Sequence, residues 1–539
     1  MNYYLYLIIL ALYISGVIVI YSRENNKKIS GILVLILIIS VSIVNIFYFN
    51  TDAEDTYIAL RYVKNYINSG EWVFNSFDRV EGYSDFFWLI LIAFVHKVTN
   101  IDIPLVARSC GLFFTILSVL YTYYLTRKIS NNEFASYMAA IILAINGSFS
   151  CYALSGLENP LFSFLLISII HVCFIGLWWL CGLLVALLFM TRPEGIVIYL
   201  PLFLFILEQQ GSFKSKIITY VKLILSSMII LLPWLIWKYN FYGYLIPNSL
   251  AAKLGMDPWH QLKIGIKYTL NFLYTNQIIV LIFSFIISLS YLSINRFKLF
   301  SRHFISYRFI VYIIIIYFIF YTYSGGDWMP GYRFYSSLIP VIAIFLFIIW
   351  SQIEKKYSII IRYNQLFIFF FISSGYLHII TNQDLFKQVR SWDHQVQGLK
   401  EIGKWFHKTL PANTVVATFP NGAFSYYNEL PTLDVAGLTD NMTGRFGIKE
   451  KFGKPGHIST NWPYIINKRP YIIAEMSGNG FESIVNKRKI FGYNNVTFEF
   501  INGRNRNGSF VNLYLRSDMA EDLITFLSVK NEIRLVFNE

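Results

Sequence analysis

The sequence predicts a mainly α-helical protein that crosses a membrane many times and ends in a smaller α/β domain. Of its 539 residues, 55% are hydrophobic and only 14% are charged, whereas soluble globular proteins carry roughly a quarter charged residues. Apolar runs long enough for membrane spans recur as far as about residue 381. We therefore expect a transmembrane domain over residues 1–381 and an α/β domain over residues 382–539.

The apolar runs give about thirteen candidate spans by length and hydropathy. They cover residues 3–21, 31–49, 84–98, 107–126, 136–152, 159–174, 176–190, 194–208, 216–238, 276–295, 308–324, 335–351 and 364–381. The first run lacks a basic flank and a small-residue cleavage site, so we interpret it as a retained span.

Basic loops predict the orientation of the spans, because cytoplasmic loops are enriched in Lys and Arg. The loops predicted inside are 22–30, 209–216, 296–308 and 352–363. The segments predicted outside are 50–83, 239–275, 325–334 and the tail after residue 382. Eleven runs separate the outside loop 50–83 from the outside tail. This odd number requires one run to be re-entrant or to merge with a neighbour, so we expect 11–13 spans.

The tail after residue 382 has the alternating pattern of an α/β domain. An amphipathic stretch predicts a helix over 383–410, ending before Pro411. Strand patterns follow at 414–419, 432–435, 471–474 and 511–515. About 155 residues are enough for one small domain.

Charge and cysteine content narrow the class of function. Much of the net charge of +14 lies in short loops between apolar runs, as expected for loops beside anionic lipid rather than for nucleic-acid binding. The four cysteines lie in apolar stretches without metal-ligand spacing. The lipid bilayer is therefore the expected partner, and nucleic acid is not.

The first long polar segment, residues 51–83, carries the strongest candidates for chemistry. Glu54 and Asp55 follow directly after an apolar run, where ionisable groups are costly and suggest function. A carboxylate at the membrane face can act as a general base toward a sugar hydroxyl. Arg61 and Tyr62 follow at helical spacing, and Arg61 could hold the carboxylate or bind a phosphate. The alternative is that the acids only stabilise a helix start.

Further polar residues interrupt the apolar runs. Glu81 enters the run 84–98, and Glu158 lies between two runs, either as a loop acid or as part of a cavity wall. Arg192 and Glu194 lie in a nearly continuous apolar stretch and should be buried and paired with each other. A structural ion pair and a substrate contact both fit Arg192.

Three outside segments complete the set of candidates. Asn248 and Lys253 lie in the first, and Lys253 could meet a lipid phosphate or extend to the interface. In the second, Trp328 and Tyr332 offer faces for a sugar, while Asp327 and Arg333 offer polar contacts; an interfacial turn is the alternative. In the third, Asp434 and Asp440, with Arg445 and His457 beyond them, could touch an acceptor or a cation, or form a folded turn.

These segments together resemble a known family. The motifs are AEDTYIALRYVKN, VFNSFDRVEGYSDFFW, SGLENPLF, TRPEG, YGYLIPNSLAAK, GGDWMPGYRF, and LDVAGLTD followed by GHIS. In this order, from residue 53 to about residue 460, they resemble the polytopic GT-C glycosyltransferases. Within that superfamily they are most similar to the terminal β-(1→2)-arabinofuranosyltransferases that act on actinobacterial cell-wall arabinan.

The resemblance implies a polyprenyl-phosphate sugar donor, an acceptor that approaches from outside, and an inverting transfer. It implies a bacterial cytoplasmic membrane protein with its active site facing the periplasm. The family's paired-acid motif corresponds to Glu54 and Asp55, with Glu54 where Asp is usual. This match implies Asp55 as the base and Glu54 as its partner. The two acids and a phosphate could hold Mg²⁺, and Mn²⁺ is equally open.

The resemblance also gives roles to the remaining candidates. Arg333, Lys253 or Arg61 would hold the donor phosphate, and Trp328 and Tyr332 would line the sugar pocket. The acceptor would be an extracytoplasmic glycan, a lipid-linked glycan or a protein. The residues expected to bind substrate are Arg61, Tyr62, Glu81, Glu158, Arg192, Asn248, Lys253, Asp327, Trp328, Tyr332, Arg333, Asp440 and His457.

Two alternatives to this function remain. The first is a GT-C enzyme for another sugar. The second is a transporter or flippase of lipid-linked sugars, which should show related halves with broken helices and paired intramembrane charges. The polar motifs gather instead on the predicted outer face, which favours the transferase.

Overall fold

The computed structural model describes residues 27–276, 305–356, 383–454, 456–475, 493–500, 510–528 and 533–538. The predicted runs 3–21 and 364–381, and nearly all of 276–295, lie outside these residues. The chain divides into two compact units. The helical unit comprises Met1–Thr51, Leu105–Leu235 and Pro258–Arg390, and the mixed unit comprises Asp52–Pro104, Ile236–Asp257 and Ser391–Glu539.

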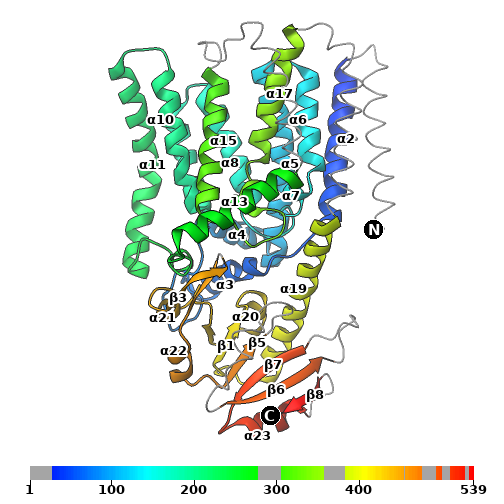
Figure 1. Cartoon of the computed structure of the whole chain (residues 1–539), viewed down its shortest axis with the longest axis vertical. Helices are drawn as coiled ribbons and strands as arrows, with labels where there is room; N and C mark the ends of the chain where they lie inside the picture. Colours follow the sequence, from blue (N-terminus) through cyan, green and yellow to red (C-terminus); the bar gives the residue numbers. More distant parts are fainter. Residues whose placement is uncertain are drawn as a thin grey trace. The chain divides into compact units, whose positions relative to one another are not determined.

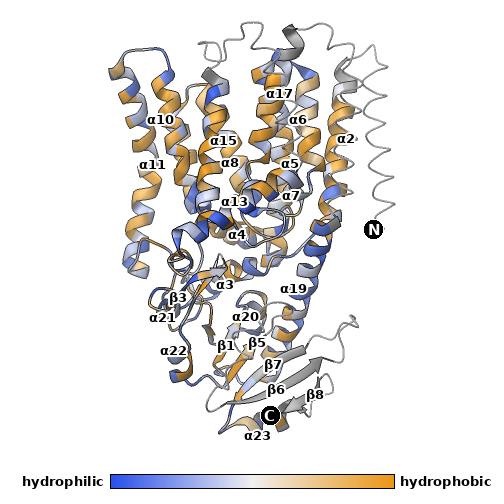
Figure 2. Cartoon of the chain, in the orientation of Figure 1, coloured by the Kyte–Doolittle hydropathy of each residue, from blue (hydrophilic) through white to orange (hydrophobic). Residues whose placement is uncertain are grey.

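Helices account for the described part of the helical unit (Figure 1). They are α2 (Lys27–Tyr48), α5 (Ile103–Ser130), α6 (Glu133–Ile145), α7 (Gly147–Ser150), α8 (Asn159–Phe174), α9 (Trp178–Thr191), the 3-10 helix η1 (Pro193–Ile198), α10 (Tyr199–Glu208), α11 (Phe213–Tyr242), α13 (Pro258–Thr275), α15 (Ile305–Tyr323), α16 (Arg333–Ser336) and α17 (Ile339–Lys356). Hydrophobic residues cover most of them (Figure 2). Three segments in the described residues, Gly31–Tyr48, Ile103–Ser130 and Phe213–Tyr242, are long and apolar enough to cross a membrane.

Glycines allow two pairs of helices in this unit to pack closely. A Cβ on Gly182 of α9 would lie 2.2 Å from the carbonyl oxygen of Leu223 on α11. A Cβ on Gly265 of α13 would lie 1.8 Å from the carbonyl oxygen of Thr322 on α15. Small residues at such positions let helix backbones approach, which is the usual basis of helix packing in membranes.

The mixed unit contains two sheets. Strands β1 (Val416–Phe419), β2 (Thr432–Asp434), β5 (Ile472–Glu475), β6 (Tyr493–Phe500), β7 (Phe510–Arg516) and β8 (Ile533–Asn538) form a six-stranded sheet in the order β2-β1-β5-β7-β6-β8. Strand β1 pairs in parallel with β2 and β5, and the other pairs are antiparallel. Strands β3 (Ile448–Lys454) and β4 (His457–Thr460) form a separate hairpin. The four predicted strands correspond to β1, β2, β5 and β7, whereas β3, β4, β6 and β8 were not predicted.

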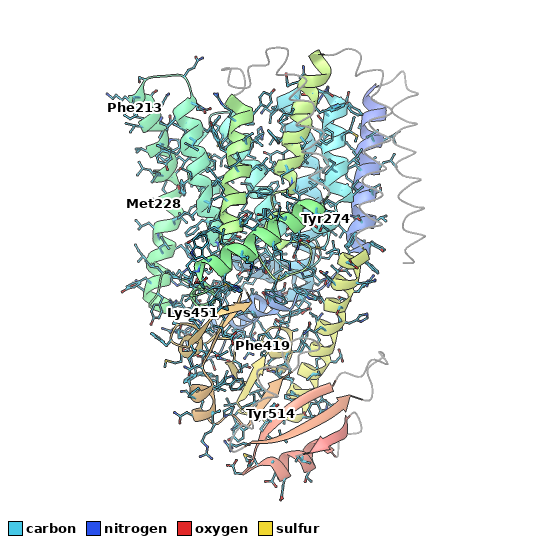
Figure 3. The ribbon with its side chains drawn as sticks, in the orientation of Figure 1. Phe213, Met228, Tyr274, Phe419, Lys451 and Tyr514 are labelled. Atoms are coloured by element: carbon cyan, nitrogen blue, oxygen red, sulfur yellow. The ribbon has the colours of Figure 1, made fainter. Side chains whose placement is uncertain are left out.

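Helices surround these sheets in the mixed unit. They are α3 (Glu54–Ser69), α4 (Phe86–Thr99), α12 (Asn248–Ala251), the part of α19 (Gln383–Thr409) from Ser391, α20 (Ala423–Asn428), α21 (Asn441–Gly444), α22 (Trp462–Asn467) and α23 (Ala520–Ser528). A hydrophobic cluster of Ala417, Leu433, Ile465, Ile473 and Tyr514 lies on the larger sheet, and Figure 3 labels Tyr514 on β7. Helix α3 packs against α4 and α20, so the first polar segment of the chain is built into this unit.

Candidate active site

Asp55 is the accessible residue in an otherwise buried stretch. From Thr51 to Val63, every residue is buried except Asp55, which is half-buried. Asp55 lies in the first turn of α3, where the positive end of the helix dipole stabilises a carboxylate. The fold therefore holds this carboxylate rigidly while leaving it partly open to its surroundings.

The neighbouring acid, Glu54, is anchored on the backbone of α20. Its Oε1 accepts hydrogen bonds from the N–H groups of Gly422 and Ala423, the second at 3.2 Å. A Cβ on Gly422 would lie 2.1 Å from the carbonyl oxygen of Glu54. Only glycine therefore lets α20 come this close to α3, and the contact fixes the turn that carries Asp55.

Burial also changes the protonation of Glu54. Desolvation raises its pKa to about 8, and the negative charge of Asp55 adds to the rise. The N–H groups of Gly422 and Ala423 oppose this shift but do not cancel it. The protonated form of Glu54 is therefore favoured at neutral pH, which removes a repulsive charge from beside Asp55.

Replacing Glu54 with Gln should make the stability of the protein less dependent on pH. The folded state holds the Glu54 proton up to about pH 8, whereas the ordinary pKa is 4.5. The wild type should therefore lose stability as pH rises between these values, because the unfolded chain releases the proton first. Glu54→Gln removes this contribution but keeps an oxygen acceptor for α20. Melting temperatures of both proteins across this pH range test the point, and parallel curves would contradict it.

Asp52 ties the start of α3 to α19. Its Oδ2 accepts a hydrogen bond from the Tyr57 hydroxyl at 2.9 Å and pairs with Lys400 Nζ at 2.5 Å. Asp52 is 1% exposed, and breaking such a buried pair is strongly destabilising. Lys400 was not predicted, and the amphipathic pattern of α19 gives no signal that singles it out.

Arg61 is buried in the mixed unit and joins several of its segments by hydrogen bonds. Its guanidinium donates to the carbonyl oxygens of Phe74 at 2.9 Å, Ser425 at 2.7 Å and Leu430 at 2.8 Å. The two remaining donors meet Thr432 Oγ1 and Asn75 Oδ1, both at 3.3 Å. All five donors of the fork are thus used by the protein. The sequence predicted that Arg61 holds the carboxylate or binds a phosphate. In the structure its donors meet acceptors of the protein, and its contact with a substrate stays a prediction.

Tyr62 and Glu81 shape the loop between α3 and α4. The Tyr62 hydroxyl donates to the Val80 carbonyl at 2.7 Å and accepts from the Gly82 N–H at 2.8 Å. Glu81 Oε2 lies 3.0 Å from Lys238 Nζ, and both side chains are 4% exposed. Desolvation raises the pKa of Glu81 to about 7, although Lys238 favours the charged form. Lys238 was missed, and its signal was a basic residue directly after the uncharged stretch 223–237.

The loop around Asp440 is a folded turn. Asn248 Nδ2 donates to the carbonyl oxygens of Gly437, Leu438 and Asp440 at 2.7, 3.0 and 3.1 Å. Asp440 accepts from the Thr443 N–H at 2.8 Å, which caps α21, and from the Tyr464 hydroxyl at 3.1 Å. These contacts give Asn248 and Asp440 a part in the folded turn, and their predicted contacts with substrate stay predictions. Lys253 follows α12 and is half-buried, and His457 begins β4.

Three of the sequence motifs meet in the helical unit. Arg192 pairs with Glu158 at 2.9 Å and with Glu194 at 2.5 Å, and the side chains of all three are at most 10% exposed. The predicted burial and pairing of Arg192 with Glu194 are confirmed. Asn159 Nδ2 donates to the Arg333 carbonyl at 2.9 Å, which joins this network to the turn that contains Arg333.

The turn at residues 325–334 is held from both ends. Arg333 Nε lies 2.5 Å from Asp327 Oδ2. The Tyr332 hydroxyl lies 2.9 Å from Thr275 Oγ1, and its ring packs on Tyr268. Trp328 is 42% exposed, so of the two predicted aromatic faces it is the more accessible.

The predicted site residues thus fall into two groups. Glu54, Asp55, Arg61, Tyr62, Glu81, Asn248, Lys253, Asp440 and His457 belong to the mixed unit, and Glu158, Arg192, Asp327, Trp328, Tyr332 and Arg333 belong to the helical unit. Among the described residues, no group of three or more His, Cys, Asp or Glu side chains is placed to hold a metal ion.

The fold of this chain is similar to that of two proteins of solved structure, ArnT and an archaeal oligosaccharyltransferase, which are GT-C glycosyltransferases. ArnT from Cupriavidus metallidurans in the apo state matches with a TM-score of 0.53 and 12% identity, over 90% of this chain and 98% of that chain. The same protein bound to undecaprenyl phosphate matches with a TM-score of 0.51 and 12% identity, over 88% and 97% of the two chains. The Archaeoglobus fulgidus oligosaccharyltransferase, tethered with an acceptor peptide, matches with a TM-score of 0.52 and 11% identity, over 95% and 76%.

Sequence comparisons add one match. A family model described as a domain of unknown function, DUF8728, matches residues 387–512. No curated protein sequence matches the chain. The predicted fold is therefore shared with these solved structures, whereas membership of the GT-C superfamily and of the arabinofuranosyltransferase branch stays a prediction.

Proposed function

We propose that this protein is a membrane glycosyltransferase that moves a sugar from a polyprenyl-phosphate donor to an extracytoplasmic acceptor, with inversion at the anomeric carbon. One observation carries the proposal. Asp55 is the accessible carboxylate in a stretch whose other residues are buried, and it lies on a chain that has the GT-C fold. A partly open carboxylate held by a rigid turn is what a general base requires.

The reaction needs one proton transfer and one displacement. Asp55 takes the proton from the acceptor hydroxyl as its oxygen attacks the anomeric carbon. The attack comes from the face opposite the donor phosphate, so the new glycosidic bond forms with inversion. The bond between the anomeric carbon and the phosphate oxygen breaks, and polyprenyl phosphate leaves with the electron pair. The phosphate is already a stable anion, so its departure needs little acid assistance.

The other residues support this step. Glu54 and Asp52 fix the turn that carries Asp55, through α20 and Lys400. Lys253 and Arg333 remain the candidates for the donor phosphate, since the Arg61 donors meet protein acceptors. Trp328 is proposed to lie against the sugar.

The proposed setting is a bacterial cytoplasmic membrane, with the site on the periplasmic side. Residues 1–381 would form the catalytic transmembrane domain with 11–13 spans, and residues 382–539 would cap it. Support comes from the mixed unit, which gathers the loop after residue 51, the segment up to Asp257 and the tail. All three were predicted outside from the distribution of basic residues.

The experiment is a donor assay with purified protein. The purified protein is incubated with synthetic polyprenyl-phosphoryl sugars as donors, first arabinofuranose and then hexoses. The acceptors are glycans, lipid-linked glycans and peptides. Parallel arms contain EDTA, Mg²⁺ or Mn²⁺. We expect release of polyprenyl phosphate that depends on both donor and acceptor. Absence of release with every donor, together with donor translocation in liposomes, would establish the flippase instead.

A further inference from the structure

The mixed unit exposes large apolar side chains around the β3–β4 hairpin. Phe446 is 63% exposed, Ile448 is 69% exposed and Phe452 is 72% exposed. Met442, Leu245 and Ile246 are also exposed, at 45%, 52% and 51%. We call these six residues the hairpin surface. Clustered apolar side chains on an exterior generally mark a contact with a membrane or with another protein.

Hydrogen bonds fasten the two segments of this surface together. Lys449 Nζ donates to the carbonyl oxygens of Ala251 and Ala252 at 3.1 and 3.3 Å. The Asp257 N–H donates to the Lys451 carbonyl at 2.9 Å, and Arg445 donates to the Ile246 carbonyl. The hairpin therefore lies along the loop that follows α11.

That loop follows directly after a helix that is long and apolar enough to span a membrane. The candidate span of α11 ends at Tyr242, and the Gly243 N–H closes the helix on the Tyr239 carbonyl at 2.8 Å. The last turns of α11 are rich in aromatic residues, with the sequence WKYNFY, which is typical of a membrane–water interface. Ile246 follows Tyr242 by four residues, a distance of at most about 14 Å along an extended chain.

We propose that the hairpin surface is a membrane anchor, inserted into the interface of the leaflet at which α11 ends. Its apolar side chains would enter the boundary between headgroups and acyl chains. Lys451, which Figure 3 labels on β3, is exposed and precedes Phe452 in the chain, so its long side chain can reach the headgroups. A bilayer is favoured over a protein partner because Leu245 and Ile246 follow the candidate span α11 within four residues of the chain, and the hairpin is hydrogen-bonded to this same loop. This inference is independent of the proposed catalytic function.

Accessibility measurements on spin labels test the anchor. Phe446→Cys, Phe452→Cys and, as a matched control, Glu521→Cys are made in the full chain, labelled with a nitroxide and reconstituted in lipid nanodiscs. Glu521 is exposed on α23 of the same unit. Three of the natural cysteines are buried and Cys110 is half-buried, so the wild-type chain supplies the labelling background.

We expect labels at 446 and 452 to collide more often with oxygen, which concentrates in lipid, than with a water-soluble nickel chelate. The label at 521 should show the reverse order. A preference for nickel at 446 and 452 would place the hairpin surface in water and overturn the proposal. Immobile labels that neither reagent reaches would also overturn it, by showing that a protein or a second copy of the chain covers the surface.

Discussion

Replacing Asp55 with Asn should reduce sugar transfer by about 10²- to 10⁴-fold, the usual contribution of a general base. Asn has nearly the same shape but cannot take a proton from the acceptor hydroxyl. Asp55 is half-buried at the first turn of α3, so the variant buries no new group and should fold normally. The rate of polyprenyl phosphate release, measured beside the melting temperature, separates the loss of chemistry from a loss of fold.

Two variants make this result specific. Glu71→Gln removes an exposed carboxylate that pairs with Arg79 at 2.7 Å, and it should leave turnover unchanged, because surface pairs contribute little. Glu54→Gln keeps an acceptor for α20 and should lose much less activity than Asp55→Asn. Near-normal turnover of Asp55→Asn would instead move the base to Glu54 or Glu81.

The helices were the most predictable part of the fold. Each apolar run within the described residues contains a helix. In lipid, the backbone N–H and C=O groups of a single segment can all be hydrogen-bonded only if the segment forms a helix. The β3–β4 hairpin was not predicted, because its strands have no continuous apolar pattern. In strand β3, three consecutive charged residues separate Ile448 from Phe452. Both apolar side chains are exposed, so the pattern resembles that of a polar loop.

The sequence predicted candidate residues for the site, but it did not reveal the contacts that these residues make. Carboxylates beside an apolar run are conspicuous, and the family motif pointed to Glu54 and Asp55. The partner of Asp52, Lys400, is 348 residues away, and nothing local to either residue reveals the pair. The exposure of Asp55 depends in the same way on how α20 packs, which only the folded chain determines.

Arg61→Met should destabilise the mixed unit by about 3 kcal/mol or more, because it leaves buried carbonyl oxygens without a donor. Arg61 is 6% exposed, and burial lowers its pKa only to about 10, so it stays charged at neutral pH. Its hydrogen bonds join α3 to segments near residues 74, 425 and 430. A flexible apolar side chain of similar length can fill the space but cannot replace these bonds. Thermal unfolding of the purified proteins measures the loss.

A control, Arg79→Met, and a second variant, Arg61→Lys, show whether Arg61 stabilises the fold or binds substrate. Arg79→Met removes an arginine whose side chain is 55% exposed, and its effect should stay within about 1 kcal/mol. Arg61→Lys keeps the charge but lacks the fork that reaches three carbonyl oxygens. It should therefore destabilise nearly as much as Arg61→Met. If Arg61→Lys melts like the wild type and instead raises the KM for the donor, Arg61 binds the lipid phosphate, and the bracing role inferred from its contacts is wrong.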